Sequence, residues 1–281
     1  MTFDRKSFLY RFLRHPSGLV GIIIILTTIA MAVLAGWVYP DGPWTIAGTP
    51  RQWPGVNQAY PLGTDSLGRD LAAGVLHGAR VSLAVGGAAA LFSIIIGTLF
   101  GGVSGYYGGW VDDVLMRITD AMQTIPSFLS AIAIVGIVGA SLPTIVLAIA
   151  IVSWPMIARL VRAEFLRLRT YDFVQSCRII GMSDFRIIFG QILPNCLAPI
   201  IVASSVLVAT AIIVEASLSF LGLGDPNQMS WGTILGNGRS ALRSAWYITA
   251  VPASALVLTV LALNLIGDAL NDVLNPRLKE R

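Results

Sequence analysis

The sequence predicts an all-α polytopic membrane protein with six transmembrane helices and both termini in the cytoplasm. Only 12% of the 281 residues are charged, against roughly 25% in soluble globular domains. Hydrophobic residues make up 55% of the chain, and the mean hydropathy is +0.75. Uncharged runs of about 20 residues, the length that crosses a bilayer as a helix, recur along the chain. Together these features indicate a chain that lies largely within the bilayer.

Six segments are expected to span the membrane, and each is an apolar run with polar residues at its ends. By number they are 19–38, part of 81–111, two between 120 and 159, about 197–220, and one between 243 and 268. The sequence Gly-Ala-Ser-Leu-Pro at 139–143 predicts a tight turn that makes the third and fourth spans a hairpin. Prolines and glycines in or beside the spans favour kinks and close helix packing: Gly97, Gly101, Gly102, Gly105, Pro126, Pro143, Pro155, Pro199 and Pro252.

The first apolar run has an alternative interpretation as a cleaved signal peptide. Basic residues precede it, and small residues near Ala30 and Ala32 loosely resemble a cleavage site. Signal peptides have an apolar core of roughly 7 to 15 residues, which is shorter than this run. Its length therefore favours a helix that is retained.

The distribution of the 19 Lys and Arg residues predicts the orientation. With the N-terminus inside, the outside retains only five of them: Arg51, Arg69, Arg80, Arg239 and Arg243. An excess of Lys and Arg in cytoplasmic loops is typical of membrane proteins, so both termini are expected inside. Nucleic-acid binding is not expected, because it would need the basic residues gathered on one water-exposed face.

Enzymatic activity is not expected of this chain. A phosphate-binding P-loop needs Gly-Lys followed by Ser or Thr, and the only two lysines, Lys6 and Lys279, follow Arg and Leu. The two histidines lack a metalloenzyme motif, and Cys177 and Cys196 lack C-x-x-C spacing. We therefore expect no cofactor, no metal and no catalytic residue, and expect both cysteines to be packing residues.

The longest cytoplasmic segment, 162–198, has the pattern helix, glycine, helix. Residues 171–180 have helical composition, and Gly181 can take the left-handed conformation that closes a helix. Ser183 can cap a second helix, with Asp184 in the first turn.

The predicted second helix carries an apolar stripe. Phe185, Ile188, Phe189 and Ile192 recur at helical spacing, and Pro194 is expected to end the helix. The stripe could pack on the lipid interface or in a groove of a soluble protein. The pattern alone does not decide between these partners.

Residues 172–184 have the sequence Asp-Phe-Val-Gln-Ser-Cys-Arg-Ile-Ile-Gly-Met-Ser-Asp, and Leu193-Pro194 follow. This segment resembles the cytoplasmic Glu-Ala-Ala loop of ABC importer permeases. In that family this loop is the coupling helix that docks into a cleft of the ATPase subunit. Gln175-Ser176-Cys177 stands where the family usually has Glu-Ala-Ala, so a hydrogen-bonding side chain remains but its charge is lost. The resemblance implies these coupling residues: Gln175, Ser176, Cys177, Gly181, Ser183, Asp184, Phe185, Ile188, Phe189, Leu193 and Pro194.

Further motifs resemble the C-type second permease subunit of the dipeptide, oligopeptide and nickel importers. They are Leu-Gly-Thr-Asp-Ser-Leu-Gly-Arg-Asp at 62–70, Tyr-Tyr-Gly-Gly-Trp-Val-Asp at 106–112, Glu-Ala-Ser-Leu-Ser-Phe-Leu-Gly-Leu-Gly at 215–224, Ser-Trp-Gly at 230–232 and Asn-Leu-Ile-Gly-Asp at 264–268. The resemblance implies a type I ABC importer permease fold. Residues 1–60 would form the N-terminal tail, first helix and outer loop, and 61–281 the permease core.

The resemblance also implies the function. The chain would be a permease subunit of an ATP-driven, binding-protein-dependent importer in the bacterial plasma membrane, forming half of the pathway for di- or oligopeptides. Its partners would be a homologous permease subunit, two ATPase subunits that bind the ATP, an extracytoplasmic solute-binding protein and membrane lipid. Nickel complexes, glutathione and opine-like compounds are alternative cargoes. An ion-coupled secondary transporter is a further alternative, although no internal repeat is evident.

Several acidic residues lie within or beside the expected spans. Glu215 lies inside the fifth span, where it could line the pathway or gate it, or could brace the following glycine-rich bend. Asp120 is expected to be structural, because Arg117 lies one turn before it. Asp65 could cap a short helix, while Arg69 and Asp70 pair with neighbours or contact a delivering protein.

Overall fold

The computed structural model describes residues 5–274. Within this range the regular structure is helical, and β pairing is confined to two isolated bridges, Ile46 with Arg69 and Thr64 with Asp70. Three of the expected cytoplasmic charges, Arg277, Lys279 and Arg281, lie outside the described residues.

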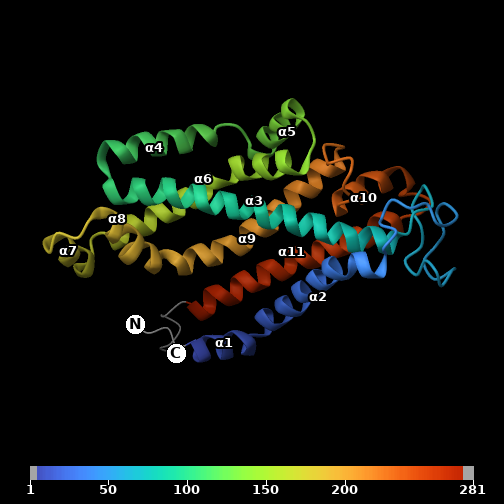
Figure 1. Ribbon diagram of the computed structural model, residues 1–281, viewed down its shortest axis with the longest axis horizontal. Coiled ribbons are helices and arrows are strands. Elements are labelled where there is room, and N and C mark those ends of the chain that lie inside the picture. Colours follow the sequence, from blue (N-terminus) through green and yellow to red (C-terminus); the bar gives the residue numbers. More distant parts are fainter. Residues whose placement is uncertain (1–4, 275–281) are drawn as a thin grey trace.

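The helices form one elongated bundle, in which α2, α3, α6, α9 and α11 run along the long axis (Figure 1). In chain order they are α1 (Arg5–Arg14), α2 (Pro16–Val38), α3 (Leu71–Tyr107), α4 (Gly109–Met122), α5 (Ser127–Val138), α6 (Leu142–Leu168), α7 (Asp172–Ile179), α8 (Asp184–Ile187), a π-helical segment (Ile188–Ile192), α9 (Leu193–Phe220), α10 (Trp231–Gly238), a 3₁₀ turn (Arg239–Ala241) and α11 (Tyr247–Leu274).

Five continuous helices are long and apolar enough to cross a membrane, and a bent pair supplies the sixth span. The five are α2, α3, α6, the unbroken run Asp184–Phe220 and α11. The prediction of six spans is thereby confirmed. The second span, α3, begins at Leu71, earlier than expected, because the Asp70 carboxylate caps it by accepting a hydrogen bond from the amide of Ala72.

The third span is broken rather than continuous. Helices α4 and α5 meet at an angle of 76° across residues 123–126. Pro126 has no N–H and disfavours the helical conformation of Ile125, so it favours a helix break at this point. The predicted turn between α5 and α6 is present, with Gly139 at φ +104° and the Ser141 hydroxyl accepting from the amide of Thr144.

Helices α3 and α6 approach closely along a row of glycines. A Cβ added at Gly97 would lie 2.7 Å from the Cβ of Ile157, and one at Gly105 would lie 2.6 Å from the Cβ of Phe165. A Cβ added at Gly101 would collide with the carbonyl group of Ala158. The expectation that these glycines permit close helix packing is confirmed.

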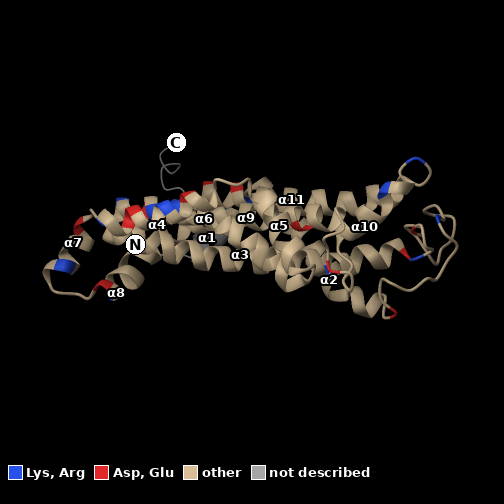
Figure 2. Ribbon diagram, turned by 90° about the horizontal axis from the view of Figure 1, so that it is seen from above, with Lys and Arg blue, Asp and Glu red and all other residues tan. Residues whose placement is uncertain are grey.

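The start of α1, the end of α11 and the loop helices α7 and α8 lie at the same end of the bundle (Figure 1). Charged residues concentrate toward this end and in the loops at the opposite end (Figure 2). Arg80, expected in the outer loop, instead lies within α3, where its Nε donates to the carbonyl of Ala32 at 3.2 Å. The arrangement fits the predicted topology, in which the termini and the 162–198 loop share one side.

Candidate functional site

The segment between α6 and α9 lies at one end of the bundle (Figure 1). It carries several exposed apolar side chains. Ile179 is 85% exposed, Ile180 74%, Phe185 71% and Phe189 43%. We refer to these four residues as the loop surface. The rings of Phe185 and Phe189 lie 4.6 Å apart, centre to centre, and form one apolar face.

The turn in the middle of this loop depends on Gly181. Its φ is +76°, in the left-handed region, as the sequence predicted. The amide of Gly181 donates to the carbonyl of Arg178, and the amide of Met182 to that of Cys177, both at 3.0 Å. These bonds satisfy the last carbonyls of α7 and fix the direction in which α8 departs.

The second helix of the loop differs from the prediction in two ways. Ser183 stands at its N-cap position, but the hydroxyl makes no capping hydrogen bond. Pro194 does not end the helix, because α8 continues through the π-helical segment 188–192 into α9. In the π segment the amide of Leu193 bonds five residues back, to Ile188, and Pro194 falls in the first turn of α9, where a missing N–H is tolerated. The loop is thus continuous with the fifth span.

The predicted apolar stripe divides between the inside and the outside of the loop. Ile192 is fully buried, and so is Ile187, which sequence reasoning did not single out. Ile188 is partly buried against the same core, so only Phe185 and Phe189 of the stripe face outward. Ile179 and Ile180, at the end of α7, were missed because a short helix end gives no periodic signal.

The underside of the loop is anchored in the bundle by apolar contacts. Val174 is fully buried in a cluster with Phe165 and Leu168 of α6, and Cys177 packs against that cluster. Cys196 is buried in it as well, and both thiols are free.

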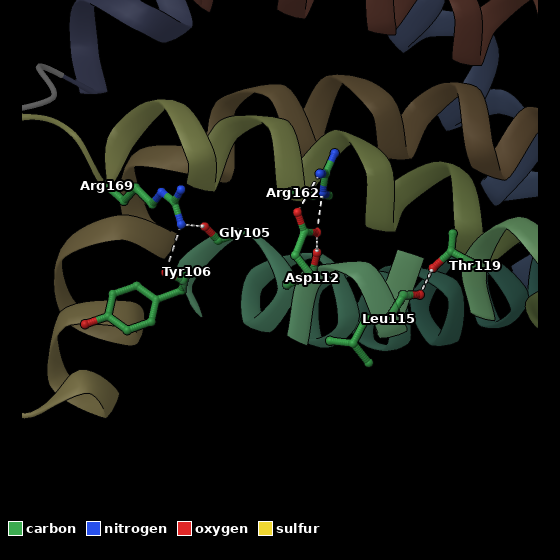
Figure 3. A network of polar contacts seen from close by, with 8 residues as sticks. Gly105, Tyr106, Asp112, Leu115, Thr119, Arg162 and Arg169 are labelled. Carbon is green, nitrogen blue, oxygen red and sulfur yellow. Dashed lines mark hydrogen bonds and ion pairs between the residues drawn. The ribbon is translucent and has the colours of Figure 1, made fainter. Parts of the chain in front are cut away.

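Polar contacts anchor both halves of the loop to the end of α3. Arg169 donates to the carbonyls of Gly105 and Tyr106, at 3.3 and 3.4 Å (Figure 3). The Tyr106 hydroxyl donates to Asp184 Oδ1 at 2.5 Å, and the Arg178 guanidinium lies 5.0 Å from the centre of the Tyr106 ring. Tyr106 therefore contacts the loop on both sides of the Gly181 turn.

A partly buried ion pair joins α4 to α6 next to this anchor (Figure 3). Arg162 Nε and Nη2 donate to the two carboxylate oxygens of Asp112, at 2.5 and 2.6 Å. The Ser104 hydroxyl donates to Asp112 Oδ1 at 2.5 Å. A two-pronged Arg–carboxylate pair is strong and directional, so the cytoplasmic ends of α3, α4 and α6 are held as a unit.

Gln175 closes the loop internally. Its Nε2 donates to the carbonyl of Arg169 at 2.9 Å. An ionised Glu at this position could not make this bond, because a carboxylate only accepts. Together with Ser176, Gln175 is exposed, and a role of either residue in docking stays a prediction.

Glu215 lies far from the loop surface and is 1% exposed. It accepts hydrogen bonds from Ser219 at 2.7 Å and from Ser82 of α3 at 3.2 Å. The amide of Trp231, at the start of α10, donates to the Ser82 hydroxyl at 3.4 Å. In this position Glu215 joins α3, α9 and α10, which favours the bracing interpretation over pathway contact.

Two other acidic residues make contacts that differ from those expected. Asp120 pairs with Arg159 of α6 at 2.7 Å, rather than with Arg117. Asp65 does not cap a helix but accepts from the amides of Leu67 and Arg69 within a turn.

The outer loop forms a cavity of about 420 Å³ against α10 and α11, lined in part by Trp44, Asp65 and Arg69. Arg69 stacks on the Trp44 ring, with 4.8 Å between its Cζ and the ring centre. Asp70 caps α3 from the edge of this cavity. Burial raises the pKa of the Asp70 carboxyl above its usual value, and bonds from the amides of Ala72 and Ala73 oppose that shift.

No cluster of His, Cys, Asp or Glu that could hold a metal occurs among residues 5–274.

Comparison with known families gives two matches. Residues 97–280 match the model of the binding-protein-dependent transport system inner membrane component. Residues 5–57 match the model of the N-terminal transmembrane domain of oligopeptide transport permease C.

Similar proteins include several named permeases. The di/tripeptide transport system permease protein DppC of Pseudomonas aeruginosa is 40% identical over 280 residues, covering 98% of this chain and 92% of the relative. The glutathione transport system permease protein GsiD of Pectobacterium atrosepticum is 41% identical over 275 residues, covering 98% and 91%. The dipeptide transport system permease protein DppC of Alkalihalophilus pseudofirmus is 41% identical over 267 residues, covering 95% and 88%.

Among solved structures, a chain of the MetNI methionine ABC transporter in an inward-facing form superposes with a TM-score of 0.58. It is 19% identical and covers 71% of this chain and 96% of its own. At this identity the match supports the fold alone.

Proposed function

Because the chain belongs to the family of binding-protein-dependent transport system inner membrane components, we propose that it is one of two homologous permease subunits of an ATP-driven importer for di- or oligopeptides. In this proposal ATP is bound and hydrolysed by two separate ATPase subunits, and a solute-binding protein delivers the cargo from outside. The loop surface is the docking site for one ATPase subunit.

The observation that carries the proposal is an exposed apolar surface on a loop whose other side is packed into the helix bundle. Four large apolar side chains face outward at the tip of the loop, while Val174 and Ile187 beneath them are fully buried. Exposing such side chains to water costs roughly 1.5–3 kcal/mol each relative to full burial. A rigid surface of this kind is typical of a site that another protein covers.

The position of the loop favours a protein cleft over the lipid interface. Helix α7 projects along the long axis beyond the other helices, and α8 lies at the same end of the bundle (Figure 1). An interfacial helix would instead lie across the flank of the bundle, at the level of the lipid headgroups. The same loop also exposes three charged residues, Asp172, Arg178 and Arg186. Apolar and charged side chains occur together in this way in protein interfaces, which have an apolar core and a polar rim.

Coupling follows from the continuous helix. A force applied at Phe185 or Phe189 passes through the π-helical segment into α9, which packs against α3, α6 and α11. The contacts of Tyr106 with Asp184 and Arg178 transmit the same displacement to α3. Movement of the docked ATPase subunits thus reaches two spans directly.

Relatives named as dipeptide, di/tripeptide and glutathione permeases support a peptide cargo. Glutathione is the second candidate, on the strength of a relative with that name at 41% identity.

Reconstitution tests the function. Proteoliposomes should contain this chain, its partner permease and the ATPase subunits, with the solute-binding protein added to the side opposite the ATPase. We expect ATP-dependent uptake of labelled dipeptide, and no ATP turnover by the isolated chain. Uptake driven by an ion gradient without ATP, or robust hydrolysis by the chain alone, would contradict the proposal. Uptake of glutathione without dipeptide would select the second cargo.

A further inference from the structure

A cavity of about 400 Å³ lies where the third span is broken. Its walls come from the break and from the middle of α6 and α9: Met122, Gln123, Ile125, Pro126, Ser127, Val152, Ser153, Met156, Leu207, Thr210 and Val214. Its volume falls in the range of about 300–1,000 Å³ that is typical of small-molecule sites.

The cavity lies near the middle of the bilayer. Ser153 is 11 residues from the outer end of α6 at Leu142, and Thr210 is 10 residues from the outer end of α9 at Phe220. At a rise of 1.5 Å per residue these positions are about 17 and about 15 Å deep. Both depths are about half of the roughly 30 Å hydrocarbon thickness.

Polar groups line the cavity at this depth. The Gln123 carboxamide is exposed, and it makes no hydrogen bond within residues 5–274. The first intrahelical bond of α5 runs from Ser130 to Pro126, so the amides before Ser130 have no acceptor in their own helix. In hydrocarbon each such group would cost several kcal/mol. The break must therefore face water or a polar ligand instead of lipid.

A polar track leads from the cytoplasmic end of the bundle to this cavity. Asp113, Arg117 and Asp120 follow one another at spacings of four and three residues, so they share one face of α4, and all three are exposed. Asp120 meets Arg159 of α6, with both side chains more than half exposed. Helix α5, beyond the break, is almost wholly apolar. The track thus ends at the cavity.

We propose that this cavity is a cargo-contact site on the wall of the translocation pathway, and that it takes the amide backbone of a short peptide. This proposal rests on the function proposed above. The Gln123 carboxamide both donates and accepts, as do the hydroxyls of Ser127 and Ser153, which matches the N–H and C=O groups common to all peptides. The flexible, apolar Met156 adapts to the variable side chains of the cargo.

Cysteine accessibility tests the site in the reconstituted complex. The background variant carries Cys177→Ala and Cys196→Ala, and Ser127→Cys or Ser153→Cys is added to it. Ile95→Cys is the matched control, because Ile95 is exposed on α3 at the depth of Ser153, between Ser93, which bonds to Ala150, and Gly97, which lies against Trp154. We expect a charged, water-soluble thiol reagent to modify Ser127→Cys and Ser153→Cys but not Ile95→Cys. Dipeptide, delivered by the binding protein in the presence of ATP, should slow the reaction.

A second variant reports on binding without a cysteine. Gln123→Leu removes the carboxamide from an exposed position, so it should fold normally, and we expect the efficiency of dipeptide uptake to fall about 3- to 10-fold, as for one or two lost hydrogen bonds. Unreactive cysteines at 127 and 153 in a complex that imports dipeptide would overturn this inference and leave the proposed function intact. Reactive cysteines protected by another transported solute, but not by dipeptide, would uphold the cavity as a contact site and overturn peptide as the cargo.

Discussion

Substitution of Gly181 tests how the loop turn contributes to coupling. Gly181 has a φ of +76°, and a Cβ built on it meets no atom within 4 Å. A side chain at this position therefore adds backbone strain without a steric clash. The loss of correctly turned loops in the variants Gly181→Asn, Gly181→Ala and Gly181→Val should therefore depend only on how well each residue tolerates the left-handed conformation.

The magnitude follows from that strain. An L-residue in the left-handed region costs about 1–2 kcal/mol relative to Gly, with Asn less affected and β-branched residues most affected. A cost of 1–2 kcal/mol corresponds to a factor of about 5–30 in a two-state population. Gly181→Ala should thus reduce the population of correctly turned loops by about that factor, Gly181→Asn by less, and Gly181→Val by more.

The assay measures dipeptide uptake and ATP hydrolysis together in proteoliposomes that contain the complete complex. Uptake and recovery of the ATPase subunit should fall in the order Gly, Asn, Ala, Val, and Gly181→Val should abolish uptake. The ligand affinity of the binding protein and the membrane insertion of the chain should not change, because Gly181 is exposed at the loop tip. If Gly181→Val retained wild-type uptake and ATPase recovery, or if Asn were as damaging as Val, the turn would not determine coupling.

Three further variants test the anchoring and the packing of the bundle. Phe185→Glu places a charge on the loop surface and should abolish recovery of the ATPase subunit without lowering the melting temperature of the chain, whereas loss of folding would contradict a pure docking role. Asp112→Asn breaks the pair with Arg162 and should destabilise the chain by about 2–3 kcal/mol, less than for a fully buried pair because Arg162 is partly exposed; an unchanged melting temperature would contradict this. Gly101→Ala should reduce folded yield by its collision with α6, while Gly87→Ala, whose Cβ meets nothing within 4 Å, should not; equal yields would show that the two helices can separate.

The sequence predicted features that depend on local chemistry. The length of the apolar runs located the spans, because a helix in lipid must satisfy the hydrogen bonds of its own backbone whatever its neighbours are. The left-handed Gly181 could likewise be predicted, since a glycine between two helical segments is the residue that closes the first.

Features that depend on distant contacts were not predictable in the same way. Pro126 indicated a kink, but the 76° angle between α4 and α5 could not be read from the proline alone. Pro194 indicated a helix end, whereas the π-helical segment before it lets one helix run on. Asp120 pairs with Arg159, a residue of another span, although Arg117 lies one turn away. For Asp120, a contact between helices overrode a local preference.

The candidate site was predicted in outline but not in its composition. Phe185 and Phe189 face outward, whereas Ile188 turns toward the core. Tyr106, which contacts the loop on both sides of its turn, was part of a matched motif but had no assigned role, because Asp184 is distant in sequence.

Photocross-linking from position 185 would test most directly whether the loop surface docks on an ATPase subunit. A photoreactive phenylalanine analogue replaces Phe185, which is 71% exposed. In a second variant it replaces Ile137, which is 86% exposed near the end of α5, as the control. In membranes that contain the complete complex, illumination should join position 185 to the ATPase subunit, and position 137 should give no such adduct. Adducts of position 185 with lipid alone would contradict docking through the loop surface.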